Sequence, residues 1–497
     1  MSRLTELKRN HRFPLMGIPL ALSLAACVTH VPQALSPQSV PETFVGRATD
    51  SKQIWPEHDW WRGFGSAELS DLIATAQLNN RDLAVAAARV LEARAQTRIQ
   101  RASLFPQFNL QAQGQRFGVG GASTTGAPIS STGNAFGLNL GASYEVDVWG
   151  LARSNLRSAE ESLKSARFAQ QGVALMVTAN VANAYFNVLA LRKRIAIAKE
   201  EIAAINAILE TIKLKVSSGA SSHLDLAQEL AQVEAAEAEV PVLEEQENEA
   251  SMSLAVLLGE LPETFEVRAR NPDDLQPPPV SPGLPSELLV RRPDVAQAEA
   301  NLAGAHANLD AARAAFLPQL TLTGNDGFAS TALSALLHGP SVAWDIGGSL
   351  LQTVFDGGKL IGQKDLAKST QTELMASYQS AVLNAYADVE NALNQVTTSS
   401  QSETHLARMI DSAREAFQIS QLQYRQGVTD FITVLQAQGT LFSAEDQLAQ
   451  TTLTRMQSVV HLDEAVGGGW IEASADRTQL TIAKTAPAVT PFAPVHP

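Results

Sequence analysis

Four short stretches of the chain alternate apolar and polar residues, whereas most of the remainder has the three-and-four spacing of amphipathic helices. In the first stretch, 107–115, Phe108, Leu110 and Ala112 alternate with polar side chains. Successive side chains of a β-strand point to opposite faces, so this pattern predicts a strand with one apolar and one polar face. The polar face is rich in amides: Gln107, Asn109, Gln111, Gln113 and Gln115. Similar alternation predicts three further strands at 134–149, 319–325 and 342–350.

The chain is a tandem duplication. Segment 181–185 (VANAY) corresponds to 389–393 (VENAL) at an offset of 208 residues. Further upstream, 104–107 (LFPQ) corresponds to 316–319 (FLPQ) at an offset of 212 residues. The first offset also relates two pairs of glycines, Gly219 with Gly427 and Gly259 with Gly467. Offsets that hold over so many positions indicate two copies of one structural unit.

Both copies predict the same order of elements. A helix begins at a plausible N-cap, Ser66 or Ser286, and runs to about residue 105 or 316. Two strands follow, joined by a loop rich in Gly, Ser and Thr at 118–133 or 324–339. A very long helix, 151–217 or 359–425, then leads to a turn and to a returning helix that ends at Gly259 or Gly467. At 1.5 Å per residue, each long helix would extend about 100 Å.

The N-terminus has the features of a lipoprotein signal peptide. Four basic residues precede a short apolar run that ends in Leu24-Ala25-Ala26-Cys27, and Cys27 is the only cysteine of the chain. We predict a signal peptide at 1–26, lipidation of Cys27 and an extended lipidated segment at 27–65. An ordinary buried cysteine is the alternative interpretation. The Ala-, Pro- and Thr-rich tail, 468–497, is predicted to be disordered.

Charge and hydropathy narrow the class of protein. The net charge of −14 argues against a nucleic-acid partner. No run of 18 or more apolar residues follows the leader, so we expect no transmembrane helix, and only strands could cross a membrane. A soluble sheet with one face packed against a core would show the same alternation of apolar and polar residues, and this alternative stays open. Four strands cannot close a barrel, so two, three or four subunits would have to share one.

An enzyme is not expected. The nine histidines are scattered without an HExxH motif, and the single cysteine rules out a multi-cysteine metal site. The glycines of 118–121 lie between two predicted strands rather than before a helix, which argues against phosphate binding. We therefore expect neither catalytic residues nor a cofactor nor a metal.

Six motifs together resemble the outer-membrane efflux lipoproteins, relatives of TolC and OprM in the NodT-type branch. They are WWRGF (60–64), NRDL (80–83), LFP (104–106), GLPSELLVRRPD (283–294), AAR (311–313) and YRQG (424–427). The resemblance covers nearly all of the chain after the leader, and 283–324 is its most specific part. Within RRPD we expect a structural role, in which Pro293 opens a helix and its charged neighbours pair locally.

The resemblance implies a mainly α protein with a membrane β-barrel. Three chains would form a 12-stranded barrel on a 12-helix periplasmic tunnel. The barrel hairpins would span 107–150 and 318–358, and the tunnel and equatorial region 66–106, 151–317 and 359–467.

The implied function is a passive exit duct of a tripartite efflux pump in the bacterial outer membrane, for drugs and other small amphiphiles. Its partners would be a periplasmic adaptor and an inner-membrane transporter of the resistance-nodulation-division type. Two alternatives remain, namely a duct for secreted proteins or peptides and a soluble periplasmic coiled-coil scaffold.

The resemblance also implies a gate at the helix turns around Gly219 and Gly427, where an adaptor would dock. In relatives, polar links between neighbouring helices hold this tip shut. Tyr424 and Arg425 match the linking positions on one side, and Asp225 matches the acidic partner. Solvated surface charges are the alternative interpretation. Where relatives often carry an acidic ring, this chain has Gln436; Thr433 is also uncharged, and Ile432 is expected to form an apolar constriction instead.

Overall fold

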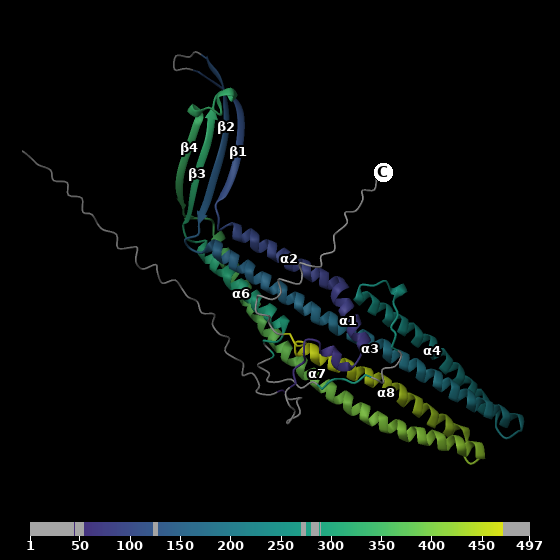
Figure 1. The fold of residues 1–497 in the computed structure, drawn as a ribbon. Coiled ribbons are helices and arrows are strands. Elements are labelled where there is room, and N and C mark those ends of the chain that lie inside the picture. Colours follow the sequence, from purple (N-terminus) through teal and green to yellow (C-terminus); the bar gives the residue numbers. More distant parts are fainter. Residues whose placement is uncertain are drawn as a thin grey trace, which may run out of the picture. The chain divides into compact units, whose positions relative to one another are not determined.

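The computed structural model describes residues 44, 54–122, 128–269, 275–279, 288 and 290–470 (Figure 1). All of them belong to the larger of two units into which the chain divides, Glu42–Pro497. The predicted signal peptide, Cys27, most of the segment 27–65 and the tail from residue 471 onward lie outside the described residues.

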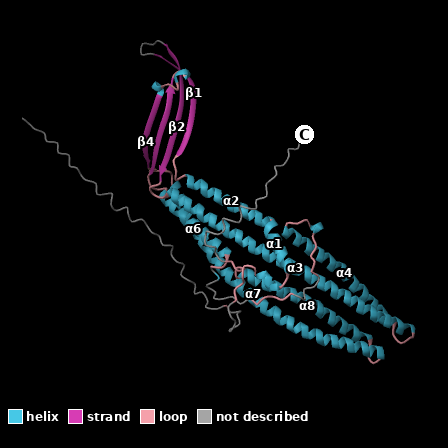
Figure 2. Cartoon of the chain, in the orientation of Figure 1, coloured by secondary structure: helices cyan, strands magenta, loops and turns pink. Residues whose placement is uncertain are grey.

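A four-stranded antiparallel sheet holds the strands in chain order. They are β1 (Gln107–Ala122), β2 (Pro128–Val146), β3 (Gln319–Ser330) and β4 (Val342–Leu351). Short 3-10 turns, η4 (Leu333–Ala335) and η5 (Gly339–Ser341), connect β3 to β4. Figure 2 shows the strands grouped apart from the helices. Much of the sequence predicted as loop at 118–133 and 324–330 is strand, because backbone pairing continues where the side-chain alternation ends.

The register places most apolar residues on one face of this sheet and most polar residues on the other; Arg116 and Asp326 on the apolar face and Leu351 on the polar face are among the exceptions. Leu110 pairs with Leu140, Tyr144 with Leu322, and Leu320 with Leu350. Even-numbered positions therefore share one face, which carries Phe108, Leu110, Leu138, Leu140, Leu320, Leu322, Trp344, Ile346 and Leu350. Odd-numbered positions share the other face, which carries Gln107, Asn109, Gln111, Gln113, Asn139, Thr321, Asn325 and Asp345. The amides predicted to line one side of the first strand thus join polar residues from all four strands.

The long and returning helices occur in the same order in both copies of the repeat. They are η1 (Trp60–Phe64), α1 (Ala67–Asn79), α2 (Arg81–Ala102), α3 (Leu151–Ser217), α4 (His223–Leu258), η2 (Pro262–Thr264), α6 (Pro293–Ala314), α7 (Lys359–Gln426) and α8 (Phe431–Ala465). The two long helices α3 and α7 agree with the prediction to within one residue. Their N-caps, Gly150 and Gly358, both have positive φ, which glycine adopts without strain.

The single helix predicted from Ser66 to about residue 105 was wrong. Ser66 does cap α1, since its hydroxyl accepts from the Leu69 amide at 3.1 Å. However, Asn80 is extended, and its side chain accepts from the amides of Asp82 and Leu83 at 2.9 and 3.1 Å, so a second helix starts there. The second copy differs as well, because α6 starts at Pro293 rather than at Ser286, which lies outside the described residues.

Matching contacts hold each copy of the repeat together internally. In the first copy, the Asn80 side-chain amide donates to the Leu257 carbonyl at 2.8 Å. In the second copy, the Arg292 guanidinium donates to the Ala465 carbonyl at 3.1 Å. These two pairs are related by the offsets of 212 and 208 residues found in the sequence. Arg292 also pairs with Asp294 and Asp388, as expected for a structural RRPD motif.

The largest hydrophobic core surrounds the middle of α3. Its buried side chains come from η1, α1, α3, α4 and α8: Phe64, Leu69, Ile73, Val177, Val181, Tyr185, Leu189, Leu254, Leu258 and Val460. By length and composition, α3 is the one described helix that could cross a membrane, contrary to our expectation of none. Because 56% of its most apolar window is buried inside the fold, we interpret that window as part of this core.

Candidate functional site

The turn between α3 and α4 contacts the end of α7, and these contacts define the tip cluster: Lys215, Ser221, Asp225 and Tyr424. The hydroxyl oxygens of Ser221 and Tyr424 lie 3.1 Å apart, within hydrogen-bond distance. Ser221 also donates to the Asp225 carboxylate at 2.5 Å. The Lys215 ammonium donates to the Tyr424 carbonyl and lies 4.0 Å from the centre of its ring. The tip cluster therefore links the two copies of the repeat through Tyr424.

Asp225 has two roles in this cluster. Its carboxylate accepts from the Ser222 amide while the Ser222 hydroxyl accepts from the Asp225 amide, which forms a capping box at the start of α4. Burial alone would raise the pKa of Asp225, but hydrogen bonds from Ser221 and Ser222 hold it below its ordinary value. The carboxylate is thus ionised at neutral pH, which strengthens its bond to Ser221.

The predicted direct link between Arg425 and Asp225 is absent from the described part of the chain. The Arg425 side chain is exposed and makes no ion pair or hydrogen bond with the described residues. Asp225 instead reaches Tyr424 through Ser221, because the capping box turns its carboxylate toward the α3–α4 turn. Gly219 and Gly427, the predicted docking positions, both have positive φ and allow the chain to reverse at the two helix ends.

The three constriction candidates lie on one exposed side of α8. Ile432, Thr433 and Gln436 are exposed, whereas their neighbours Phe431 and Val434 are buried. The spacing of three and four residues places Ile432 and Gln436 on the same helix face. The Thr433 hydroxyl donates to Asp430, the N-cap of α8, at 2.6 Å, so this threonine also stabilises the N-terminal end of α8.

One turn beyond Asp225, α4 buries an unpaired carboxyl group. Glu229 is fully buried, and neither of its carboxyl oxygens has a hydrogen-bond partner. Burial raises its pKa to about 7. The Glu229 carboxylate is also close enough to Tyr424 to contribute, together with Asp225, to the raised pKa of that phenol, whose main cause is burial. Glu229 therefore titrates near neutrality directly behind the tip cluster.

The buried position of Glu229 predicts a pH-dependent gate. A carboxyl whose pKa is raised by burial behind the tip cluster binds its proton there more tightly than it would in water. As pH rises from about 4.5 to about 7, the contacts of the tip cluster should lose stability, and a channel that these contacts close should open more frequently, with a plateau above pH 7. Single-channel recordings at a series of periplasmic-side pH values should show this rise in the wild-type protein. The Glu229→Gln channel should respond much less, and an unchanged pH response would contradict this role for Glu229.

The polar face of the sheet carries a hydrogen-bonded row across three strands. The Asn139 side chain donates to Asn325 at 3.2 Å, and Asn325 donates to both carboxylate oxygens of Asp345 at 3.2 and 3.1 Å. Asn139, Asn325 and Asp345 thus fix one another's orientation. Gln111, which lies opposite Asn139 in the strand register, continues this polar surface onto β1.

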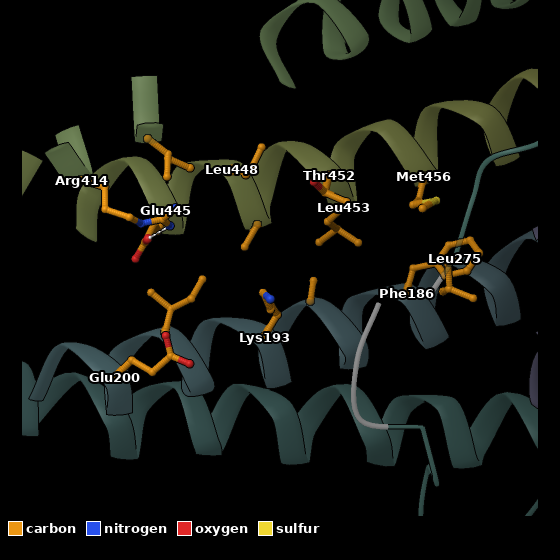
Figure 3. Close-up of a pocket in the computed structure, with 14 residues that line it drawn as sticks. Phe186, Lys193, Glu200, Leu275, Arg414, Glu445, Leu448, Thr452, Leu453 and Met456 are labelled. Atoms are coloured by element: carbon orange, nitrogen blue, oxygen red, sulfur yellow. Dashed lines mark hydrogen bonds and ion pairs between the residues drawn. The ribbon is translucent and has the colours of Figure 1, made fainter. Parts of the chain in front are cut away.

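A cavity of about 380 Å³ lies between α3, α7 and α8 (Figure 3). Its walls are mainly apolar, with Phe186, Leu453 and Met456 among them, while Arg414 and Glu445 form an ion pair at 2.8 Å along one side. No group of three or more His, Cys, Asp or Glu side chains in the described residues could hold a metal ion.

Sequence reasoning missed Lys215, Ser221 and Glu229. Ser221 lies only four residues before Asp225, but its bond to Tyr424 spans 203 residues, and no local pattern indicates such a contact. Glu229 did have a signal, since it lies three residues after Leu226 and four before Val233 on the apolar side of α4. A carboxyl at a core position of a predicted helix could have been singled out on that basis.

Comparison with known proteins identifies the family. The outer membrane efflux protein profile matches residues 72–260 and 284–468, one match for each copy of the repeat. The pyoverdine export outer membrane protein OpmQ of Pseudomonas putida is 38% identical over 461 residues, which cover 91% of this chain and 97% of OpmQ. The antibiotic efflux pump outer membrane protein ArpC, also of Pseudomonas putida, is 32% identical over 440 residues, which cover 86% of this chain and 89% of ArpC.

A solved protein structure has the same fold. The outer-membrane channel OprN superposes with a TM-score of 0.81 at 27% identity, over 87% of this chain and 98% of OprN. These likenesses confirm the predicted fold class, the class of function and the outer-membrane location. The chain belongs to the outer membrane efflux protein family, and it is an outer-membrane efflux channel with an internal repeat.

Proposed function

We propose that this chain forms the passive exit duct of a tripartite pump and that three copies share one 12-stranded barrel. The observation that carries the proposal is the sheet itself, whose apolar and polar faces run across all four strands. Lipid would contact the even-numbered face, whereas Gln107, Asn109, Gln111 and Gln113 would line water. Both edge strands, β1 and β4, need partners that the described residues of a single chain do not supply.

The periplasmic end of the duct would be the helix tips. We propose that the turns at Gly219 and Gly427 dock on an adaptor that connects the duct to an inner-membrane transporter of the resistance-nodulation-division type. The tip cluster and the exposed side of α8 with Ile432, Thr433 and Gln436 would form the gate. Without an acidic residue at Gln436, strong block by divalent cations is not expected at that position.

The barrel would be held additionally by a lipid anchor. We propose that the segment Leu24–Cys27 is a lipobox and that Cys27 carries the lipid after removal of residues 1–26. The lipid would keep the chain's N-terminus at the periplasmic leaflet of the outer membrane, on the same side as the helices. This proposal rests on the sequence of the leader.

Drugs and other small amphiphiles are the proposed substrates, since the antibiotic efflux protein ArpC is similar over most of the chain. A second candidate is the export of pyoverdine or a similar secreted molecule. This candidate is favoured by the higher identity to the pyoverdine export protein OpmQ, 38% compared with 32% for ArpC. The amide-lined face of the sheet is uncharged along most of β1 and would suit either kind of molecule.

Deletion of the gene in its own host tests both candidates. Loss of a drug-efflux duct should raise the accumulation of an amphiphilic dye and the susceptibility to hydrophobic antibiotics, and the wild-type gene should restore both. Loss of an export duct should instead lower the amount of pyoverdine or a similar secreted molecule in the medium. Unchanged dye accumulation, susceptibility and secretion of such a molecule would contradict the proposed function.

A further inference from the structure

The cavity of about 380 Å³ lies where the two copies of the repeat meet. Its walls come mainly from α3 of the first copy and α8 of the second, and its volume is in the range of small-molecule sites. Ala190 on α3 and Ala449 on α8 belong to the wall, and their small side chains leave the space open. In the same stretch of the two helices, the Arg194 guanidinium donates to the Asp446 carboxylate at 2.5 Å and holds α3 and α8 in place.

The cavity extends along these helices. Phe186 and Glu200 both line it, and on α3 they are separated by about 21 Å at 1.5 Å per residue. Met456 and Glu445 both line it as well, and on α8 they are separated by about 16 Å. The space therefore suits an elongated molecule.

The two ends of the cavity differ in chemistry. Phe186 and Met456 lie at one end, whereas Glu200 and the ion pair of Arg414 with Glu445 lie at the other (Figure 3). The apolar end can bury a hydrocarbon group, which the hydrophobic effect favours. The charged end can hold a head group of opposite charge.

The charged end has one carboxylate to spare. Arg414 is already paired with Glu445 at 2.8 Å. Lys193, which lies between the two ends, also has an interaction of its own within the fold. The Glu200 carboxylate is exposed and has no hydrogen bond or ion pair with the described residues. Glu200 is therefore free to pair with a cation.

Other carboxylates add to the negative charge around Glu200. Its neighbour Glu201 is half-buried; burial raises the pKa of Glu201 to about 6, and the carboxylates of Glu239, Asp446 and Glu445 add to this rise. Carboxylates from α3, α4 and α8 are thus close enough to repel one another. A bound cation would relieve this repulsion, whereas an anion would increase it.

We propose that this cavity binds an elongated cationic amphiphile, with its hydrocarbon part between Phe186, Leu453 and Met456 and its cationic head at Glu200. The bound molecule contacts α3 and α8 together and thereby stabilises the contact between the two copies of the repeat. The proposal concerns binding to the helices, and it holds whether or not the molecule is also exported through the proposed duct.

Photolabelling tests the site in the full-length protein in lipid nanodiscs. The probe is an analogue of dodecyltrimethylammonium with a diazirine in its alkyl chain. After illumination, mass spectrometry should find the label in peptides that contain residues 186–200 and 445–456. An excess of dodecyltrimethylammonium should remove the label. Dodecyl sulfate, which has the same chain and an anionic head, should compete more weakly by roughly tenfold.

Three variants locate the head and the chain of the probe. Glu200→Gln should raise the concentration for half-maximal labelling about fivefold, the value of one exposed ion pair. Ala449→Phe fills the cavity and should abolish the label in these peptides. Glu92→Gln, which removes the same charge from α2 outside the cavity, is the matched control and should label as wild type does. Because Glu200 is exposed, Glu200→Gln decides the proposal even if Ala449→Phe does not fold.

The outcomes are separate for the site and for its ligand. Label in both peptides that Glu200→Gln weakens and Glu92→Gln does not supports the proposal. Label confined to the sheet or to other helices overturns the site. Equal competition by dodecyl sulfate, or equal labelling of Glu200→Gln and wild type, overturns the cationic ligand. None of these results depends on transport, so a failure here leaves the proposed duct to its own test by gene deletion.

Discussion

Replacing Asp225 with alanine is expected to raise the open fraction of the channel by roughly 100-fold. The change removes the carboxylate from the tip cluster and from the capping box of α4. A lost cap or a lost side-chain hydrogen bond is worth about 1 kcal/mol, so three subunits together would lose about 3 kcal/mol of closing free energy. Single-channel recordings in planar bilayers measure the open fraction directly.

Two variants distinguish the hydrogen bonds that join Asp225, Ser221 and Tyr424 from the capping of α4. Tyr424→Phe removes only the hydroxyl that faces Ser221, and it should raise the open fraction by a smaller factor. Ser222→Ala is the matched control, because it removes the capping bond to the Asp225 amide but leaves the Asp225 carboxylate bonded to Ser221. If Ser222→Ala opened the channel as much as Asp225→Ala, helix capping rather than the tip cluster would control the gate.

Arg425→Ala tests whether the gate has a second link. Within the described residues Arg425 has no partner, so a link made by Arg425 would have to reach a neighbouring subunit. An increase in open fraction comparable to that of Asp225→Ala would indicate such a link. An unchanged open fraction would assign the closing contacts to the tip cluster alone.

The stability of the protein is expected to fall as pH rises from about 4 to about 8, owing largely to Asp463. This residue is fully buried in α8, and neither carboxylate oxygen has a partner. Burial raises the pKa of Asp463 to about 8. The folded state therefore holds a proton that the unfolded chain releases near pH 4, so stability decreases between these values and levels off above pH 8.

Asp463→Asn should remove most of this pH dependence and stabilise the protein by a few kcal/mol at pH 8. Asp463→Ala introduces the residue that the first copy of the repeat has at the corresponding position, the buried Ala255. Unfolding followed by circular dichroism at pH 5, 7 and 9 compares the three proteins. The same loss of stability with pH in Asp463→Asn and in wild type would show that other groups cause it.

The long elements could be predicted closely from the sequence, whereas their long-range contacts could not. The limits of α3 and α7 follow from Gly150 and Gly358 at their starts and from the turns at Gly219 and Gly427, which are local signals. The break at Asn80 was missed because the residues on both sides favour helix, so that only the extended asparagine and its capping bonds divide α1 from α2.

The strands and the tip cluster show two further limits of prediction from the sequence. β1 and β2 extend into a Gly-, Ser- and Thr-rich segment whose side chains do not alternate, because strand pairing depends on the backbone. At the tip, Asp225 and Tyr424 could be singled out by resemblance, but the serine that joins them could not. Its role depends on how α3, α4 and α7 pack, which no short segment encodes.

The central claim is that the amide-bearing face of the sheet lines the conducting path. Gln111→Cys and Leu110→Cys place a thiol on opposite faces of β1 at adjacent positions. A charged, water-soluble thiol reagent added to single channels in planar bilayers should change the current through Gln111→Cys, and the current through Leu110→Cys and wild-type channels should stay constant. A current change in Leu110→Cys without one in Gln111→Cys would contradict the account.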